Sequence, residues 1–246
     1  MTEKEYRADP RLSQSTLKLF SGAEEDYSQE QSNYKLKTPF APSEAMIKGT
    51  FLHSIIENQG NFDRDKFAIA PCNDKRKKEY KEFAAECTAE YIMTEKDLTD
   101  VRNMWEKLCL EHPNIWEDIK RGDKEKAFFN ENYKALIDLD VDDGHFYDWK
   151  KTSDITIRGL RKSCANYGYD FQAYHYLQWG KSFTFVFFQD VAPYEIVVYK
   201  CEPEFIQRGK AKWNEAHDRY MARNIKQTRE ISMLWPSEKL KSETGS

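Results

Sequence analysis

Long apolar runs are absent from this sequence of 246 residues. The longest apolar stretch, residues 183–188, is interrupted by a threonine, whereas a membrane-spanning helix needs about 20 apolar residues. The first seven residues are mostly polar or charged, unlike a secretory signal peptide. These features argue against a membrane span or a leader and predict a soluble, cytoplasmic protein.

Cysteine is sparse and widely spaced. The sequence holds five cysteines, an odd number, and no two of them lie close together: Cys72, Cys87, Cys109, Cys164 and Cys201. A scattered odd set favours reduced thiols over a disulfide framework. The clustered spacing that an iron–sulfur centre requires is also missing. We therefore expect neither disulfides nor an iron–sulfur cluster.

The middle of the chain predicts a β-hairpin that brings two aspartates together. Residues 133–150 form two segments rich in β-branched and aromatic side chains, joined by an Asp-Asp-Gly turn. Asp138 and Asp148 then meet at one end of the hairpin, and Lys150 shares the face of Asp148 because side chains alternate along a strand. Paired carboxylates favour Mg²⁺, and an ammonium beside them can position water or offset charge on a phosphate. An isolated pattern of this kind is more often a surface hairpin with scattered charges.

Two predicted helices add polar residues at one-turn spacing. Upstream, residues 43–57 begin with a serine cap and place Gly49, His53 and Glu57, which follow one another at a spacing of four, on one face. Downstream, Gln172 and Tyr176 are one turn apart in an aromatic-rich helix. Each helix has a structural alternative, because a helical histidine is more often a core residue than a ligand, and an aromatic helix usually packs on a sheet.

Taken in order, the motifs Gly-x-x-x-His, Ile-Asp, Asp-Trp-Lys and Gln-x-x-x-Tyr resemble the PD-(D/E)XK nuclease superfamily, and within it the RecE-type phage exonucleases, which are similar to exonuclease VIII. An opening Leu-Ser-x-Ser segment at 12–15, a charged stretch at 73–122 and a strand at 193–199 are similar as well. The resemblance implies an α/β fold in which a mixed central sheet is flanked by helices. It also implies Mg²⁺-dependent digestion of linear double-stranded DNA from 5′ ends, which leaves 3′ single strands for a phage annealing protein.

The resemblance assigns roles by position. It implies that His53, Asp138, Asp148 and the carbonyl of Trp149 hold Mg²⁺, for which Mn²⁺ can substitute. Lys150 would serve the attacking water, and Gln172 and Tyr176 would line the site. Glu125 falls where the family often has another acid, although a single glutamate is usually solvated.

The sequence departs from the family pattern next to both aspartates. Leu136 and Ile137 stand where the family usually has Arg or Pro, and Lys151 stands in place of the first Thr of Asp-x-Lys-Thr-Thr. Neither change removes a metal ligand, so the departures affect substrate contacts more than chemistry.

Basic residues do not outnumber acidic ones. The net charge is −4 and the pI is about 5.9, whereas DNA binding usually draws on Lys and Arg that displace counterions. Basic side chains can nevertheless be confined to a channel. Lys151, Arg158 and Arg161 follow the hairpin and are the DNA-binding candidates. A second basic group at 208–226 is better explained as the solvated face of an amphipathic helix.

The predicted organisation is one nuclease domain over residues 1–226, with a helical insert at about 73–122 and strands near 126–131, 133–141, 145–151, 182–188 and 194–200. A polar tail at 227–246 carries an apolar island at 231–236, which would dock on its own domain or on a neighbouring subunit. The resemblance implies a ring-like homo-oligomer, with a tetramer favoured. Alternatives are a structure- or sequence-specific endonuclease on the same fold and a non-catalytic DNA-binding module. A phage-encoded protein would work in the host cytoplasm.

Overall fold

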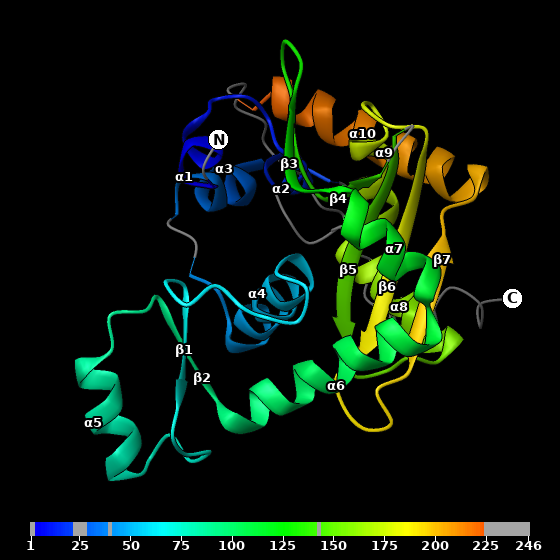
Figure 1. Cartoon of the computed structure of the whole chain (residues 1–246). Coiled ribbons are helices and arrows are strands. Elements are labelled where there is room, and N and C mark those ends of the chain that lie inside the picture. The colour runs from blue at the N-terminus through cyan, green and yellow to red at the C-terminus, as the bar shows by residue number, and fades with distance from the viewer. Residues whose placement is uncertain (1–2, 22–28, 39–40, 142–143, 224–246) are drawn as a thin grey trace, which may run out of the picture.

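A five-stranded sheet organises the molecule. The computed structural model describes residues 3–21, 29–38, 41–141 and 144–223 (Figure 1). The sheet has the order β3-β4-β5-β6-β7, and β5 pairs with β6 in parallel while the other pairs are antiparallel. Its strands are β3 (Asp123–Phe129), β4 (Lys134–Val141), β5 (His145–Thr152), β6 (Ser182–Gln189) and β7 (Ile196–Lys200). The mixed sheet confirms the predicted α/β class.

All five predicted strands are present, each within a few residues of its expected bounds. The interior strand β6, between β5 and β7, buries six consecutive side chains, as expected for a strand covered on both faces. Asp142 and Asp143 of the predicted turn lie outside the described residues, as does the tail with its apolar island.

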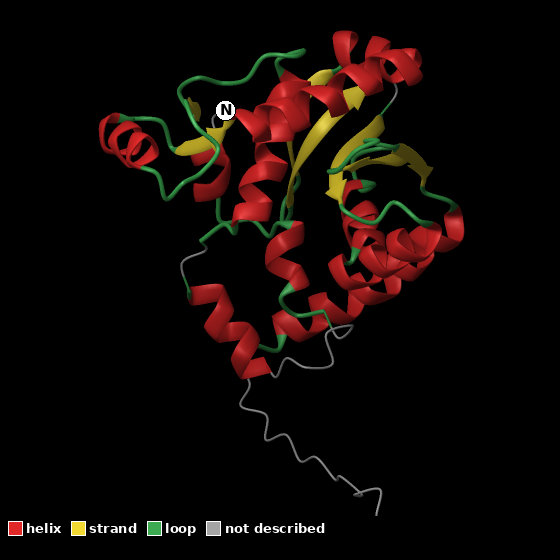
Figure 2. Ribbon diagram, turned by 90° about the horizontal axis from the view of Figure 1, so that it is seen from below, coloured by secondary structure: helices red, strands yellow, loops and turns green. Residues whose placement is uncertain are grey.

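Helices cover both faces of the sheet (Figure 2). Trp149 on β5 packs in a core cluster with α4 (Glu44–Glu57), α6 (Glu95–Glu111) and α7 (Pro113–Arg121). Phe146, on the opposite face of β5, packs in a second cluster with residues of the helices on that side. These helices are α8 (Ile157–Tyr167), α9 (Tyr169–Tyr176) and α10 (Pro203–Met221). Three shorter helices precede α4: α1 (Glu3–Ala8), α2 (Gln14–Lys18) and α3 (Gln29–Lys37).

The predicted helical insert is not purely helical. It holds α5 (Lys78–Glu86), α6 and α7, but also β2 (Tyr91–Thr94), which pairs in parallel with β1 (Phe67–Ala70). The four residues of β2 are too few to give a clear periodic pattern, and the partner strand β1 lies before the insert. The sequence pattern therefore did not predict this small sheet. The sheet and α5 project from the main body at the lower left of Figure 1.

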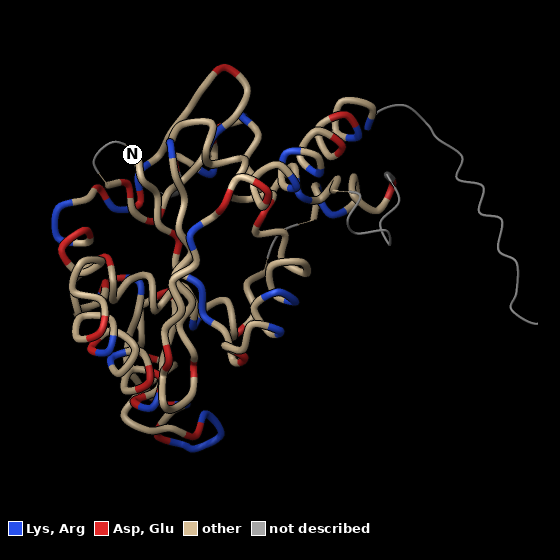
Figure 3. The backbone as a smooth tube through the Cα atoms, turned by 90° about the vertical axis from the view of Figure 1, so that its right-hand side faces the viewer, with Lys and Arg blue, Asp and Glu red and all other residues tan. Residues whose placement is uncertain are grey.

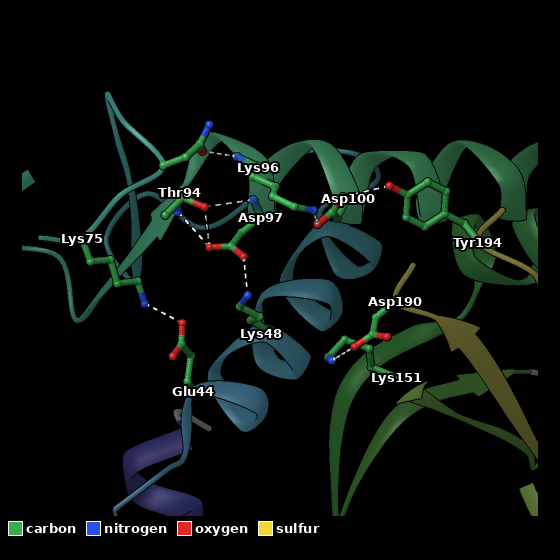
Figure 4. Close-up of polar contacts among 11 residues, drawn as sticks. Glu44, Lys48, Lys75, Thr94, Lys96, Asp97, Asp100, Lys151, Asp190 and Tyr194 are labelled. Carbon is green, nitrogen blue, oxygen red and sulfur yellow. Dashed lines mark hydrogen bonds and ion pairs between the residues drawn. The ribbon is translucent and has the colours of Figure 1, made fainter. Parts of the chain in front are cut away.

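Polar contacts tie the insert to α4 (Figure 4). The Lys48 ammonium lies 2.7 Å from the carboxylate of Asp97 at the start of α6, and Lys75 lies 2.7 Å from Glu44. Asp97 is buried and also accepts hydrogen bonds from Thr94, with which it forms a capping box. Burial opposes ionisation of Asp97, but the hydrogen bonds from Lys48 and Thr94 outweigh it and lower its pKa. These contacts fix the position of α4.

A buried histidine locks α9 onto the sheet. The indole N–H of Trp213 on α10 donates to His175 Nδ1 at 3.0 Å, so the imidazole proton must be on Nε2. Nε2 in turn donates to the carbonyl of Lys134 on β4 at 3.0 Å. Burial lowers the pKa of His175 to about 4. A neutral His175 therefore connects α10, α9 and β4.

Candidate active site

Asp138 lies where β4 separates from β5. The two strands pair up to Leu139 opposite Tyr147, and Asp138 and Asp148 are the next residues along them. Ile137 packs in the core cluster of α8 and α9, whereas Leu139 packs in the cluster of α4 and α6. Residues two apart normally face the same side of a sheet, so the alternation of side chains along β4 is broken at Asp138. The backbone N–H of Trp149 donates to Asp138 Oδ2 at 2.9 Å. The aspartate side chain thus replaces a strand-to-strand hydrogen bond and is held beside β5.

Asp148 is buried on the face of β5 that α9 covers. Its carboxylate forms an ion pair with Lys150 and accepts a 2.5 Å hydrogen bond from Gln172 Nε2. Burial raises the pKa of Asp148 to about 6; the Lys150 ammonium opposes this rise and the charge of Asp138 adds to it. The ionised form of a buried carboxylate is destabilised by desolvation, and a metal cation bound beside it would stabilise that form.

His53 approaches the same point from α4. Its Nε2 lies 2.9 Å from the carbonyl oxygen of Trp149, and its Nδ1 lies 3.5 Å from Asp138 Oδ2. The structure therefore brings together three groups from three elements: the imidazole of His53 on α4, the carboxylate of Asp138 on β4 and the backbone carbonyl of Trp149 on β5. His53 is at least 85 residues from the other two along the sequence.

Two glutamates that the sequence argument did not assign complete the group. Glu57 is one turn beyond His53 on α4, and Glu125 lies opposite Asp138 in the register of β3 and β4. Ligand atoms of His53, Glu57 and Glu125 lie within 4.8 Å of one another. Glu125 also has a φ of 48°, a left-handed conformation that is uncommon for a non-glycine residue and that often marks functional sites. The expectation that Glu125 is merely solvated is therefore incomplete.

Glu125 is exposed to a cavity between walls of protein rather than to a flat surface. Desolvation by these walls and the charges of Asp138 and Glu57 raise its pKa to about 9. The spacing of four from His53 was the one sequence signal for Glu57. No local pattern could have shown that Glu125 on β3 would lie beside Glu57 on α4.

The cavity has a volume of about 1100 Å³. His53, Glu57, Glu125, Trp149 and Lys150 all line it. Its wall also includes three further cationic side chains and three tyrosines: Lys66, Lys124, Lys151, Tyr6, Tyr167 and Tyr169. Figure 3 shows Lys and Arg interspersed with Asp and Glu along the rest of the chain. Because the same wall carries Glu57, Asp63 and Glu125, its lysines answer only part of the charge objection to DNA binding.

The other predicted residues lie further from this centre. Tyr176 is half-buried and is not among the cavity-lining residues. Burial, with the charges of Asp148 and Asp138, raises its pKa, and a hydrogen bond with Gln172 opposes the rise. Lys151 lines the cavity, but its ammonium is 2.5 Å from Asp190 Oδ2 (Figure 4). Arg158 and Arg161 are exposed on α8 and are not among the cavity-lining residues.

The donor atoms fit a hard divalent cation. Carboxylates and a backbone carbonyl are oxygen ligands of the kind that Mg²⁺ and Mn²⁺ take, and imidazole is accepted more readily by Mn²⁺. The raised pKa values of Asp148 and Glu125 indicate that these carboxylates are destabilised in their charged form and so support a cation at this place. Crowded, desolvated carboxylates are costly without a cation and are stabilised by one.

Comparison with protein families decides the classification. Residues 13–234 match a family described as a PDDEXK-like domain of unknown function (DUF3799). The chain belongs to this family. Asp138, Asp148 and Lys150 of this PDDEXK-like domain form the D…D-x-K arrangement on β4 and β5. Membership confirms the resemblance to the PD-(D/E)XK superfamily, and the narrower RecE-type assignment stays a prediction.

A solved structure supports the fold. A crystal structure of a "putative exonuclease" from Eubacterium rectale is 13% identical, covers 98% of each chain and has a TM-score of 0.66. The structure of SSO0001 is 12% identical over 72% of this chain and 87% of that chain, with a TM-score of 0.29, too low to support an argument. No curated protein matches the PDDEXK-like chain. None of the helices among the described residues is long and apolar enough to cross a membrane.

Proposed function

We propose that this protein is a Mg²⁺-dependent deoxyribonuclease that hydrolyses phosphodiester bonds. The observation that carries the proposal is the convergence of Asp138, Asp148 and Lys150 in a PDDEXK-like domain, with His53 and the Trp149 carbonyl beside them. His53, Trp149 and Lys150 line the cavity, and the two aspartates lie next to them behind its wall. Both acids and the lysine are retained, which argues against a purely non-catalytic DNA-binding module.

Each residue of the site has a role that follows from its position. Asp138, Asp148, His53 and the Trp149 carbonyl would hold the cation, and Glu57 and Glu125 lie close enough to contribute. When bound, Mg²⁺ would polarise the phosphate and lower the pKa of a coordinated water.

Lys150 is held between the Asp148 carboxylate and the ring of Tyr169, whose centroid is 5.2 Å from the ammonium. A fixed ammonium at this place can orient the attacking water and offset charge that develops on the phosphate. Gln172 donates to Asp148 and so sets the orientation of that carboxylate.

The finer proposal concerns the substrate and the direction of cleavage. We propose an exonuclease that digests linear duplex DNA from 5′ ends and leaves 3′ single strands for a phage annealing protein. The sequence resemblance supports this proposal, and the name of the Eubacterium rectale structure supports its exonuclease part alone. A ring-like homo-oligomer, with a tetramer favoured, would hold DNA topologically despite the net charge of −4.

Cleavage of matched linear and closed-circular duplex DNA, each with Mg²⁺ and with EDTA, tests these proposals. An exonuclease releases nucleotides from the linear duplex alone, and only with Mg²⁺. Nicking or linearisation of the circle identifies an endonuclease on the same fold. Binding without cleavage of either substrate, in Mg²⁺ or in Mn²⁺, contradicts the proposal and leaves a DNA-binding module.

A further inference from the structure

The cavity carries apolar surface as well as cations. Eight large hydrophobic residues are exposed among the described residues, and two of them, Met46 and Tyr167, line the cavity. Tyr167 is 58% exposed. Cations suit the phosphates of a nucleic acid and an aromatic ring suits its bases, so this combination fits a nucleotide better than it fits a simple anion.

Tyr167 is held in place although it is exposed. It is the last residue of α8, which ends at Gly168 in the left-handed conformation, with a φ of 60°. The Lys18 ammonium donates to the Tyr167 carbonyl at 2.5 Å. The Tyr167 ring stacks on the ring of Tyr169, with centroids 5.8 Å apart and planes at 29°. Tyr169 therefore supports one side of an exposed ring whose backbone is fixed.

The supporting ring is also the one beneath Lys150. The buried Tyr169 ring contacts both the exposed Tyr167 ring and the Lys150 ammonium, which is 5.2 Å from its centroid. The position for the reacting phosphate and the exposed ring are thus separated by one aromatic side chain. A base attached next to that phosphate would be within reach of Tyr167.

We propose that Tyr167 is a stacking platform for the base next to the scissile phosphate, and that this nucleotide is unpaired when it enters the site. The inference rests on the proposed nuclease function and adds the state of the substrate. Within a duplex the neighbours cover both faces of an internal base, and a terminal base is still held by its partner strand. An internal base must therefore leave the stack, and a terminal base must leave its partner, to enter the cavity and meet Tyr167. A cavity of about 1100 Å³ is close in size to sites for drug-sized ligands, which favours a short length of one strand.

The test compares three variants on oligonucleotides of defined structure. Tyr167→Leu removes the aromatic ring, Tyr167→Phe keeps it, and Tyr34→Leu makes the same change at another exposed tyrosine, on α3 and away from the cavity. Cleavage with Mg²⁺ is measured on single strands that each carry one abasic position, and on duplexes with paired or mismatched ends.

For the wild-type protein, we expect one abasic position to lower kcat/KM by about 5- to 100-fold, the range for loss of one stacked base. Tyr167→Leu should show a similar loss on the intact strand and no further loss at that abasic position, because ring and base form one interaction. Tyr167→Phe should recover the sensitivity to the abasic position. Mismatched ends should be cleaved faster than paired ends by the wild type and by all three variants, because the cost of unpairing belongs to the DNA and does not depend on the side chain at position 167.

Three results would overturn the inference. If Tyr167→Leu keeps the wild-type response to every abasic position, or if paired and mismatched ends are cleaved equally by the wild type, Tyr167 is not the platform and the nuclease function stands. If the wild type cleaves no DNA in Mg²⁺ or Mn²⁺, the nuclease function itself is wrong and the inference fails with it.

Discussion

Gly49→Ala should make the protein more stable and less active. Gly49 lies in the interior of α4, one turn before His53, and lines the cavity. A Cβ atom at this position would meet no other atom within 4 Å, so the substitution causes no clash. Alanine is favoured over glycine in a helix interior by about 0.8–1.0 kcal/mol, which corresponds to a rise in Tm of roughly 2–4 °C for a chain of this size.

The same methyl group occupies space beside His53 that the substrate would use. We therefore expect DNA cleavage by Gly49→Ala to fall at least several-fold while its Tm rises, measured by thermal unfolding and by single-turnover cleavage of linear duplex. Gly209→Ala is the matched control. There a Cβ would lie 1.9 Å from the carbonyl oxygen of Asp170, so α9 and α10 must move apart and stability must fall. A Gly49→Ala protein with wild-type activity would refute the view that this space is kept for substrate.

Three further predictions concern the metal, the pH dependence and the assembly. His53→Ala should weaken metal affinity by roughly 10- to 100-fold, with activity partly recovered by excess Mn²⁺, whereas an unchanged metal titration with a lowered Tm would make His53 structural. The pKa of His175 is lowered in the folded state from 6.5 to about 4, so its contribution to stability is present above pH 6.5 and is lost as the pH falls towards 4; the shift corresponds to about 3 kcal/mol. The raised pKa values of Asp148 and Glu125 change the stability with pH in the opposite sense. The quantity to measure is therefore the difference in unfolding free energy between the wild type and His175→Gln. This difference should become smaller as the pH falls from 6.5 to about 4, and a constant difference would contradict the assignment. A ring that encloses DNA should continue to degrade long linear duplex after excess competitor is added, whereas a monomer in light scattering together with immediate arrest would exclude the ring.

Local patterns predicted part of the site because part of it is local. Asp148 and Lys150 share a strand face by alternation, and Asp138 follows from the hairpin that joins its two strands. The roles of His53 and Gln172 came from the family resemblance, with helical spacing as support. In each case the spacing along one element, or across one turn, carried the information.

The remaining features depend on contacts between distant elements. Glu125 meets Glu57 only because α4 packs across the irregular point of β3 and β4. Lys151, expected to contact DNA, is paired with Asp190 from the end of β6, and β2 has its partner outside the insert. Periodicity within one segment holds no information about such partners.

The most direct test of the central claim is nucleotide release from linear duplex DNA by the wild type and by three single variants, Asp138→Asn, Asp148→Asn and Lys150→Ala. We predict Mg²⁺-dependent release by the wild type and none above background by any variant, with circular dichroism showing each variant folded. A double variant should lose no more than a single one, because the three groups act as one unit. Full activity in any one of the folded variants would contradict the assignment of the site.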